Sequence, residues 1–257
     1  MAKLSIITIN YNARVGLEKT LASVAEQNFT DFEYIIIDGG SDDDSVGVVK
    51  KYESKITKWV SEKDAGIFNA QNKGAQKAIG DHLLFLNSGD ILENINVLES
   101  FAPQLGSHEL VYGDLVVDNG KERVRAEMPD KLDVYYFMIS SLAHPCTFIS
   151  TALFKKLGGY REDLKITGDY EFFLRAVLVH NASYLHIAKP VAVFNSAGIS
   201  SNPAHEEKQL AERKRSWELN FSQASIKAFE EYTRLLRSSD LKVGRFIKNI
   251  LNPFKAK

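Results

Sequence analysis

This sequence of 257 residues contains a single cysteine and no long apolar segment. Cys146 cannot form a disulfide within the chain, which favours a reducing compartment, and its isolation from other ligand types argues against a zinc site. No apolar run approaches the roughly 18 residues that indicate a membrane-spanning helix. The first residues lead directly into a strand pattern without the features of a signal peptide. We therefore expect a cytoplasmic protein.

A strong excess of either charge is also missing. The 32 basic and 33 acidic residues give a net charge of −1, so no overall positive field attracts nucleic acid, and we expect no nucleic-acid partner. The hydrophobic content of 44% and the charged content of 25% are ordinary for a globular protein. The length fits one large α/β domain, alone or with an appendage.

Several common catalytic and phosphate-binding motifs are absent too. The first predicted strand is followed by Asn10–Val15 rather than by Gly-x-Gly-x-x-Gly, and the chain has no Walker-type Gly-x-x-x-x-Gly-Lys-Ser. It also lacks the Gly-x-Ser-x-Gly elbow of serine hydrolases. These absences disfavour the common dinucleotide, P-loop and serine-hydrolase chemistries.

The first ninety residues instead show strands that alternate with helices. Strand patterns occur at Leu4–Ile9, Tyr34–Ile37, Lys58–Val60 and Leu83–Leu86, with helical periodicity between them. This alternation predicts βαβ units in a parallel sheet, and the four apolar residues of the last strand suit its centre. Because such connections are right-handed, the loops after the four strands should gather along one edge.

After Asp90 the pattern changes. Asn119-Gly120 is a strong hairpin signal between Glu109–Val117 and Glu122–Ala126, and it predicts an antiparallel element. The later expectations are a strand at His144–Ile149, a helix at Gly168–Val177, two strands near Tyr184–Ile187 and Val191–Phe194, and one long charged helix from about Ala204 to Arg237.

Three aspartates follow predicted strands and should meet at one edge of the sheet. Each of Asp38, Asp64 and Asp90, taken alone, is more commonly a turn or cap residue. Together, clustered carboxylates repel unless a cation or hydrogen-bond donors compensate them, which implies a bound partner. Mg²⁺ usually takes one or two carboxylates and completes its shell with water and phosphates, so Asp90 with a diphosphate fits. Farther on, Asp169 would complement a helix dipole, which is a purely structural role.

Five segments occur in an order and at separations that make the chain resemble the family 2 glycosyltransferases. These are inverting enzymes of the GT-A fold that build bacterial surface polysaccharides, and the resemblance covers roughly residues 3 to 200. It implies an α/β fold with a Rossmann-like mixed sheet, flanking helices and C-terminal helices. The segments are Ser5–Asn12, Ile36–Asp42, Ser61–Gly74, Phe85–Asp90 and Gly168–Arg175.

The resemblance also implies roles for individual residues. Asp90 would bind the metal, Mg²⁺ or Mn²⁺. Asp169 would be the general base that takes the proton of the acceptor hydroxyl, and His144 would lie near the acceptor. The nucleotide-sugar donor would be bound by Tyr11, Asn12, Asp38, Asp64, Asn72, Lys73 and Ser88.

The implied organisation is a catalytic domain, residues 1–203, followed by a helical extension, residues 204–257. Within the domain, residues 1–93 would bind the nucleotide sugar and residues 94–203 the acceptor, a glycan or a polyprenyl-linked molecule. The extension ends in residues 241–257, where apolar residues recur at helical spacing among basic ones. This segment suits peripheral contact with the inner face of an anionic membrane, but it could equally dock on the protein itself or on a second copy in a homodimer.

The chain departs from the family pattern at two motifs. The metal motif usually has several acidic residues, whereas Asn87–Asp90 has one, and the aspartate pair after the second strand is reduced to Asp38-Gly39. His205 could supply a late metal ligand, although an exposed histidine at a helix start is the commoner case.

Two other function classes remain open. A sugar nucleotidyltransferase would need a Gly-rich, Arg-containing loop after the first strand, which this chain lacks. A non-catalytic nucleotide-sugar-binding or scaffold protein with a degenerate metal site is the remaining alternative.

Overall fold

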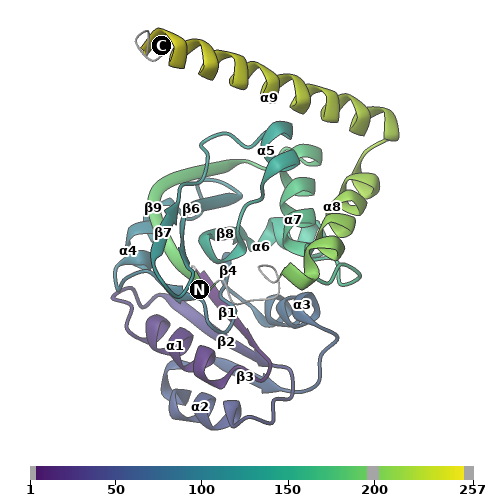
Figure 1. Ribbon diagram of the computed structural model, residues 1–257. Coiled ribbons are helices and arrows are strands. Elements are labelled where there is room, and N and C mark those ends of the chain that lie inside the picture. Colours follow the sequence, from purple (N-terminus) through teal and green to yellow (C-terminus); the bar gives the residue numbers. More distant parts are fainter. Residues whose placement is uncertain (1–3, 196–202, 252–257) are drawn as a thin grey trace.

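One mixed sheet of nine strands forms the centre of this computed structural model, which describes residues 4–195 and 203–251, with side chains as far as Arg237 (Figure 1). The order along the sheet is β3-β2-β1-β4-β8-β6-β9-β5, and β7 pairs with β6. The strands are β1 Leu4–Asn10, β2 Phe32–Asp38, β3 Lys58–Ser61, β4 His82–Phe85, β5 Ile91–Leu92, β6 Leu110–Asp118, β7 Arg123–Ala126, β8 Thr147–Ser150 and β9 Tyr184–Asn195.

Helices cover both faces of this sheet, and the last one extends away from it (Figure 1). They are α1 Arg14–Ala25, α2 Ser45–Lys51, α3 Ile67–Lys77, α4 Val97–Phe101, α5 Val134–Ile139, α6 Thr151–Lys156, α7 Gly168–Leu174, α8 Glu206–Asn220 and α9 Gln223–Leu251. Among the described residues, no helix is apolar over a length that would take it across a bilayer.

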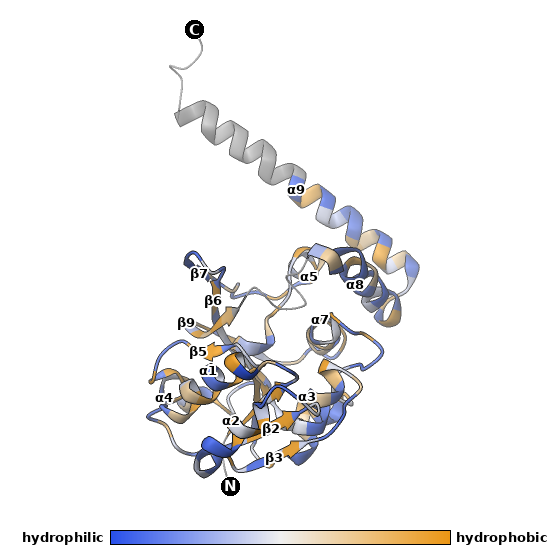
Figure 2. Cartoon of the chain, turned by 60° about the horizontal axis from the view of Figure 1, so that its bottom comes forward, coloured by the Kyte–Doolittle hydropathy of each residue, from blue (hydrophilic) through white to orange (hydrophobic). Residues whose placement is uncertain are grey.

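The N-terminal half is the predicted parallel unit. The four strands β1, β2, β3 and β4 run parallel to one another, with Asn10 level with Asp38 at the ends of β1 and β2. Alternate residues enter opposite cores, so Ile6 packs with α1 and α4 while Ile7 packs with α3 and α6. Figure 2 shows strand β2 as strongly hydrophobic, whereas the nearby helices α1, α2 and α3 carry both hydrophobic and hydrophilic residues. The carboxyl ends of the four strands therefore share one edge, as predicted.

The C-terminal half confirms the hairpin but corrects two predictions. The two strands expected between residues 184 and 194 are one strand, β9, whose pairing with β6 shifts register on either side of Asp114. Pro190 fits at this irregularity because a shifted register does not require its missing N–H.

The single helix predicted from about Ala204 to Arg237 was wrong, because the chain breaks between α8 and α9. Phe221 is extended, and the Ser222 hydroxyl accepts a hydrogen bond from the N–H of Ser225 at 3.2 Å, which starts the next helix. Trp217, Phe221 and Phe229 pack together across this corner, with ring centroids 5.2 to 5.8 Å apart. Figure 1 shows α8 beside α7 and α9 turning across α5. The expectation for residues 241–257 concerns side chains that lie outside the described residues.

Candidate functional site

A cavity of about 630 Å³ opens between the loop that follows β4 and the first turn of α7. It contains Ser88, Asp90, His144 and Asp169, four of the residues that the sequence marked for donor, metal, acceptor and base roles. The rest of its wall is largely apolar and comes from Ala13, Ile67, Phe68, Asn87, Leu115, residues 139–143, Pro145, Ile166, Thr167, Tyr170, Phe194, Gln209 and Arg213.

The loop Asn87–Asp90 is held tightly against the end of β1. The N–H and the hydroxyl of Ser88 both donate to the carbonyl of Ile9, each at 3.0 Å. The N–H of Gly89 donates to Thr20 Oγ1 at 3.0 Å. Within the loop, the N–H of Asn87 donates to Asp90 Oδ2 at 3.2 Å. The carboxylate of Asp90, 4% exposed as a residue, is therefore fixed in orientation at the wall of the cavity.

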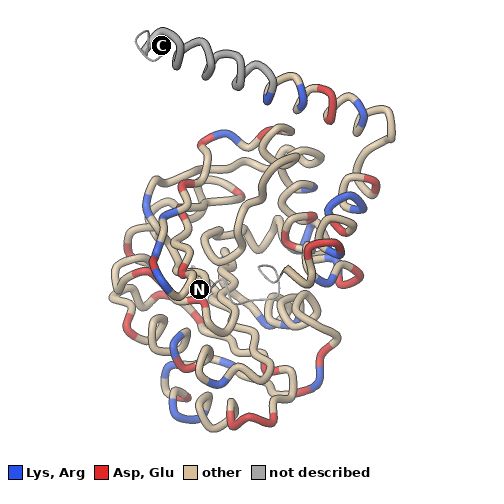
Figure 3. Tube along the Cα trace, viewed as in Figure 1, with Lys and Arg blue, Asp and Glu red and all other residues tan. Residues whose placement is uncertain are grey.

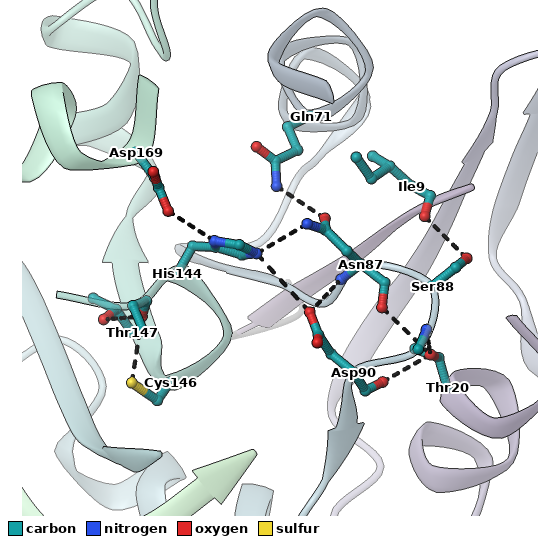
Figure 4. A network of polar contacts seen from close by, with 12 residues as sticks. Ile9, Thr20, Gln71, Asn87, Ser88, Asp90, His144, Cys146, Thr147 and Asp169 are labelled. Carbon is teal, nitrogen blue, oxygen red and sulfur yellow. Dashed lines mark hydrogen bonds and ion pairs between the residues drawn. The ribbon is translucent and has the colours of Figure 1, made fainter. Parts of the chain in front are cut away.

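His144 connects this loop with Asp169 (Figure 4). Its Nδ1 lies 2.9 Å from Asp169 Oδ2, and its Nε2 lies 3.0 Å from Asn87 Nδ2 and 4.0 Å from Asp90 Oδ2. The chain of contacts continues to α3, where Gln71 Nε2 donates to Asn87 Oδ1 at 3.0 Å. One polar network thus runs from α3 to α7 and passes the cavity at His144.

The direction of these hydrogen bonds fixes the proton on a neutral His144. Because the Asn87 oxygen accepts from Gln71, its amide nitrogen donates to Nε2, and Nδ1 then carries the hydrogen donated to Asp169. Burial of the ring opposes its protonation, but the hydrogen bond to Asp169 and the charges of Asp169 and Asp90 outweigh it and raise the pKa of His144. The pair is therefore suited to hold Asp169 as an oriented carboxylate.

Asp169 stands in the first turn of α7. Its Oδ1 accepts from the N–H of Tyr170 at 2.8 Å, and its side chain remains 19% exposed toward the cavity. A carboxylate with one oxygen anchored on a histidine and an open face toward a cavity can accept a proton from a bound hydroxyl group.

A second group of predicted residues lies outside the cavity, around Tyr11 and Asp64. Tyr11 is 66% exposed. A Cβ added at Gly39 would stand 2.6 Å from Asp64 Oδ2 and 3.2 Å from Tyr11 Cδ2. The Asp64 carboxylate and the Tyr11 ring therefore approach the backbone of Gly39 more closely than a side chain at this position would allow. This explains why a glycine follows Asp38.

Asp38 is fully buried, and five donors contact its carboxylate. Its two oxygens accept from Asn10 Nδ2 at 2.8 Å, from the hydroxyls of Ser41 and Ser61 at 2.6 Å each, and from the N–H groups of Gly40 and Ser41 at 3.2 and 3.0 Å. Ser41 Oγ in turn accepts from the N–H of Asn12 at 2.8 Å. Asp38 therefore organises the loops that carry Tyr11 and Asn12, and it does not line the cavity.

Asn72 and Lys73 also lie outside the cavity wall. Asn72 ties α3 to the loop after α6, because its Nδ2 donates to the Tyr160 carbonyl at 2.8 Å and its Oδ1 accepts from the Tyr160 N–H at 3.0 Å. Lys73 Nζ lies 2.8 Å from Glu62 Oε1. Both residues therefore make contacts within the fold and do not line the cavity that contains Asp90.

We predict that Asp38→Asn lowers the free energy of unfolding by about 2 to 3 kcal/mol near neutral pH, because an amide cannot satisfy all five donors. Burial alone would raise the pKa of Asp38, but the hydrogen bonds from Ser41, Ser61 and Asn10 outweigh it and hold the pKa below its usual value. Such a carboxyl stabilises the fold above its unfolded pKa of about 4, and this stability is lost as the pH falls through the lower folded pKa. The difference between variant and wild type in urea unfolding should therefore shrink below about pH 4. Asp42→Asn, in the exposed part of the same loop, is the control. It should change neither the free energy of unfolding nor its dependence on pH.

Few side chains at the cavity could act as metal ligands. Within the described part of the chain, no group of three or more His, Cys, Asp or Glu side chains is arranged as a complete metal site, and His205 does not line the cavity. Asp90 offers one carboxylate at an open cavity. That fits Mg²⁺ or Mn²⁺ that takes its other ligands from phosphate and water, and it does not fit a closed structural site.

Sequence reasoning missed four residues of this site. Gln71 and Asn87 lie in two of the segments that carry the family resemblance, but neither was assigned a role, although Asn87 occupies a position where the metal motif is usually acidic. Gln209 and Arg213 come from α8 and line the cavity, and no local pattern in a charged helix signals such a role. Figure 3 shows α8 carrying charges of both signs.

The chain is similar to known proteins in sequence and in fold. A family model described as glycosyl transferase family 2 matches residues 5–158. The uncharacterized glycosyltransferase Rv1514c of Mycobacterium tuberculosis is 34% identical over 206 residues, which cover 77% of this chain and 77% of that protein. The PGL/p-HBAD biosynthesis glycosyltransferase Rv2957 of the same organism is 30% identical over 208 residues, 77% of this chain and 78% of that protein.

Two solved structures share the fold. Staphylococcus aureus TarS 1-349 in complex with UDP-GlcNAc superimposes with a TM-score of 0.64 at 24% identity over 75% of this chain. The mannosyltransferase PcManGT of Pyrobaculum calidifontis, in complex with GDP-Man and Mn²⁺, gives 0.58 at 14% identity over 75% of this chain. This chain spans 58% and 56% of those two solved chains, respectively. Both likenesses establish a GT-A architecture.

Proposed function

The chain belongs to glycosyl transferase family 2 and is a glycosyltransferase, and on this premise we propose that it is a metal-dependent, inverting enzyme. It would move a sugar from a nucleoside diphosphate to a glycan or polyprenyl-linked acceptor in cell-surface glycan or glycolipid synthesis. The observation that supports this most is that Asp90 and Asp169 line one cavity and are joined through His144.

The donor would lie across the ends of β1 and β2 and enter the cavity with its diphosphate. The exposed ring of Tyr11 and the carboxylate of Asp64, which both lie close to Gly39, would contact the base or the ribose. Asn12 follows β1 and Ser88 follows the neighbouring strand β4, so both would lie along the donor toward Asp90. Asp38 would act on the donor indirectly, by fixing the loops of Tyr11 and Asn12. Asn72 and Lys73 would act similarly, by fixing α3. The UDP-GlcNAc in TarS and the GDP-Man in PcManGT support a nucleotide-sugar donor for this fold.

Asp90 would hold Mg²⁺ or Mn²⁺ together with the phosphates of the donor. When bound, such an ion offsets the negative charge that develops on the departing diphosphate. The Mn²⁺ found with PcManGT supports this choice of ion. The chain itself contributes the fixed orientation of the carboxylate, through the hydrogen bond from the Asn87 N–H.

Asp169 would take the proton from the acceptor hydroxyl as that hydroxyl attacks the anomeric carbon. A single base on the acceptor side is what one direct displacement requires, and one displacement inverts the configuration at that carbon. His144 donates from Nδ1 to Asp169 Oδ2, which fixes the orientation of the carboxylate at the cavity wall. The apolar residues on the remaining wall would exclude water from the reacting sugar.

A release assay tests this function. Full-length protein is mixed with UDP-GlcNAc or GDP-mannose, with Mn²⁺, and with extracted lipid-linked acceptors, and free nucleoside diphosphate is measured. We expect release that needs both the metal ion and an acceptor. Tight nucleotide binding without release from any donor would contradict the proposal and favour the non-catalytic binding or scaffold protein.

We further propose that residues 1–203 form the catalytic domain and residues 204–257 a helical extension. We also propose that residues 241–257 contact the membrane surface peripherally. In sequence, Lys242, Arg245 and Lys248 alternate with apolar residues, and no acidic residue follows Asp240. A basic amphipathic segment of this kind is attracted to anionic lipid.

We therefore predict that replacing these three residues together (Lys242→Glu, Arg245→Glu, Lys248→Glu) lowers co-sedimentation with phosphatidylglycerol liposomes at least about 10-fold, since each basic residue near such a surface contributes about 1 kcal/mol. The control carries Lys208→Glu, Lys214→Glu and Lys227→Glu on exposed positions of α8 and α9. Equal sedimentation of both triple variants and the wild type would exclude membrane contact through this segment.

A further inference from the structure

Helix α8 places a buried carboxylate under the segment that leads into α7. Glu212 is 8% exposed, and its two oxygens accept from three consecutive backbone N–H groups, those of Lys165, Ile166 and Thr167, at 2.9, 2.8 and 3.0 Å. The hydroxyl of Thr167 lies 3.3 Å from the same carboxylate. Two residues after Thr167 comes Asp169.

The other side of Asp169 is also held by α8, through Tyr170. The indole Nε1 of Trp217 donates to the Tyr170 hydroxyl at 2.7 Å, and that hydroxyl donates to the carbonyl of Phe137 at 2.8 Å. The guanidinium of Arg213 lies 4.3 Å from the centre of the Tyr170 ring and donates to the carbonyl of Ser140. Arg213 thereby joins α8 to two walls of the cavity.

The contact made by Glu212 is more specific than hydrophobic packing between two helices. A buried carboxylate is costly to desolvate, and an apolar side chain would attach one helix to another without that cost. Here the carboxylate is satisfied by backbone donors of one short segment, so its position sets the position of that segment. Asp169, between Thr167 and Tyr170, is fixed on both sides by residues of α8.

We propose that α8 is part of the catalytic site, and that Glu212 is a positioning residue which, with Arg213 and Trp217, sets the distance between Asp169 and the acceptor hydroxyl. This inference rests on the function proposed above and extends it. The catalytic unit then includes the first helix beyond residue 203. A misplacement of about 1 Å can lower an enzymatic rate about 100-fold, so the hydrogen bonds of Glu212 would act on rate.

The test uses Glu212→Gln in the full chain, because glutamine keeps the size of the side chain but presents an N–H₂ to the backbone donors. We expect kcat to fall about 10- to 100-fold. The KM for the donor and the Kd for UDP with Mn²⁺ should stay within about twofold, because Glu212 lies on the acceptor side. Glu218→Gln is the matched control on the same helix: its side chain is 41% exposed and faces Lys214 at 3.8 Å, and it should leave all values unchanged.

Hydrogen exchange gives a second readout that needs no activity. In Glu212→Gln the amides of residues 165–167 should exchange at least about 10-fold faster, while those of β1 keep their protection. Unchanged exchange at 165–167, or faster exchange with unchanged kcat, would overturn the inference. If the wild type itself transfers no sugar, the proposed function fails, and the exchange data still report separately on the contact.

Trp217→Phe covers the case in which Glu212→Gln fails to fold. This change keeps an aromatic ring beside Phe221 and Phe229, and it removes the indole N–H that donates to Tyr170 together with part of the packed volume. A fall in kcat of about 3- to 10-fold with an unchanged donor KM is expected from one lost hydrogen bond of about 1 kcal/mol. An unchanged kcat here would count against the inference equally.

Discussion

Replacing Asp169 with asparagine should abolish sugar transfer while nucleotide binding stays nearly intact. General-base catalysis contributes about 10²- to 10⁴-fold, so we expect kcat to fall by about 10³-fold. The asparagine oxygen can still accept from the N–H of Tyr170, which keeps the first turn of α7 in place. What the variant loses is the ability to take a proton from the acceptor.

The measurement combines transfer kinetics with calorimetric titration of UDP in the presence of Mn²⁺. Asp163→Asn, six positions earlier and paired with Arg161 and Arg215 at 2.9 and 2.7 Å, is the control and should keep transfer. If Asp169→Asn weakened nucleotide binding as much as transfer, Asp169 would be a structural residue of the helix start, the role that its sequence position alone also allows.

Replacing Asp90 with asparagine should remove the effect of metal on nucleotide binding. The substitution preserves an oxygen for the N–H of Asn87, so the loop can keep its shape, but it removes the one carboxylate that this loop offers to a cation. Because loss of even an outer partner of a metal site costs about 10- to 100-fold in affinity, we expect the Kd for UDP with Mn²⁺ to rise at least about 10-fold.

Paired titrations with and without Mn²⁺ separate this effect from a damaged site. Without metal, the wild type and Asp90→Asn should bind UDP equally. With metal, only the wild type should gain affinity. A gain of the same size in both proteins would show that the ion is held elsewhere, and the role of Asp90 would have to be abandoned.

The parallel half of the fold could be predicted because its signals are local. Leu83–Leu86 is uniformly apolar, and β4 is in fact buried between two cores. Asn119-Gly120 likewise specified its hairpin within a few residues. The break at Phe221 was missed because helical periodicity continues across it. The aromatic packing of Trp217, Phe221 and Phe229, which turns the chain there, is a tertiary effect.

The site could be predicted in part, for the same reason. Asp90 and Asp169 belong to segments that are recognisable in the sequence, and both line the same cavity in the structure. The burial of Asp38 could not be predicted, because strand ends do not reveal how many donors a neighbouring loop supplies to a carboxylate. Glu212 is one acidic residue among many in a charged helix, and only its contact with residues 165–167 distinguishes it.

The most direct test of the central claim is a crystal structure of Asp169→Asn soaked with UDP-GlcNAc or GDP-mannose and Mn²⁺, with the ion located by its anomalous scattering. We expect an ion between Asp90 and the diphosphate, and a sugar whose anomeric carbon faces residue 169 across the cavity. An ion or diphosphate bound away from Asp90, or a sugar that turns its anomeric carbon from residue 169, would contradict this claim.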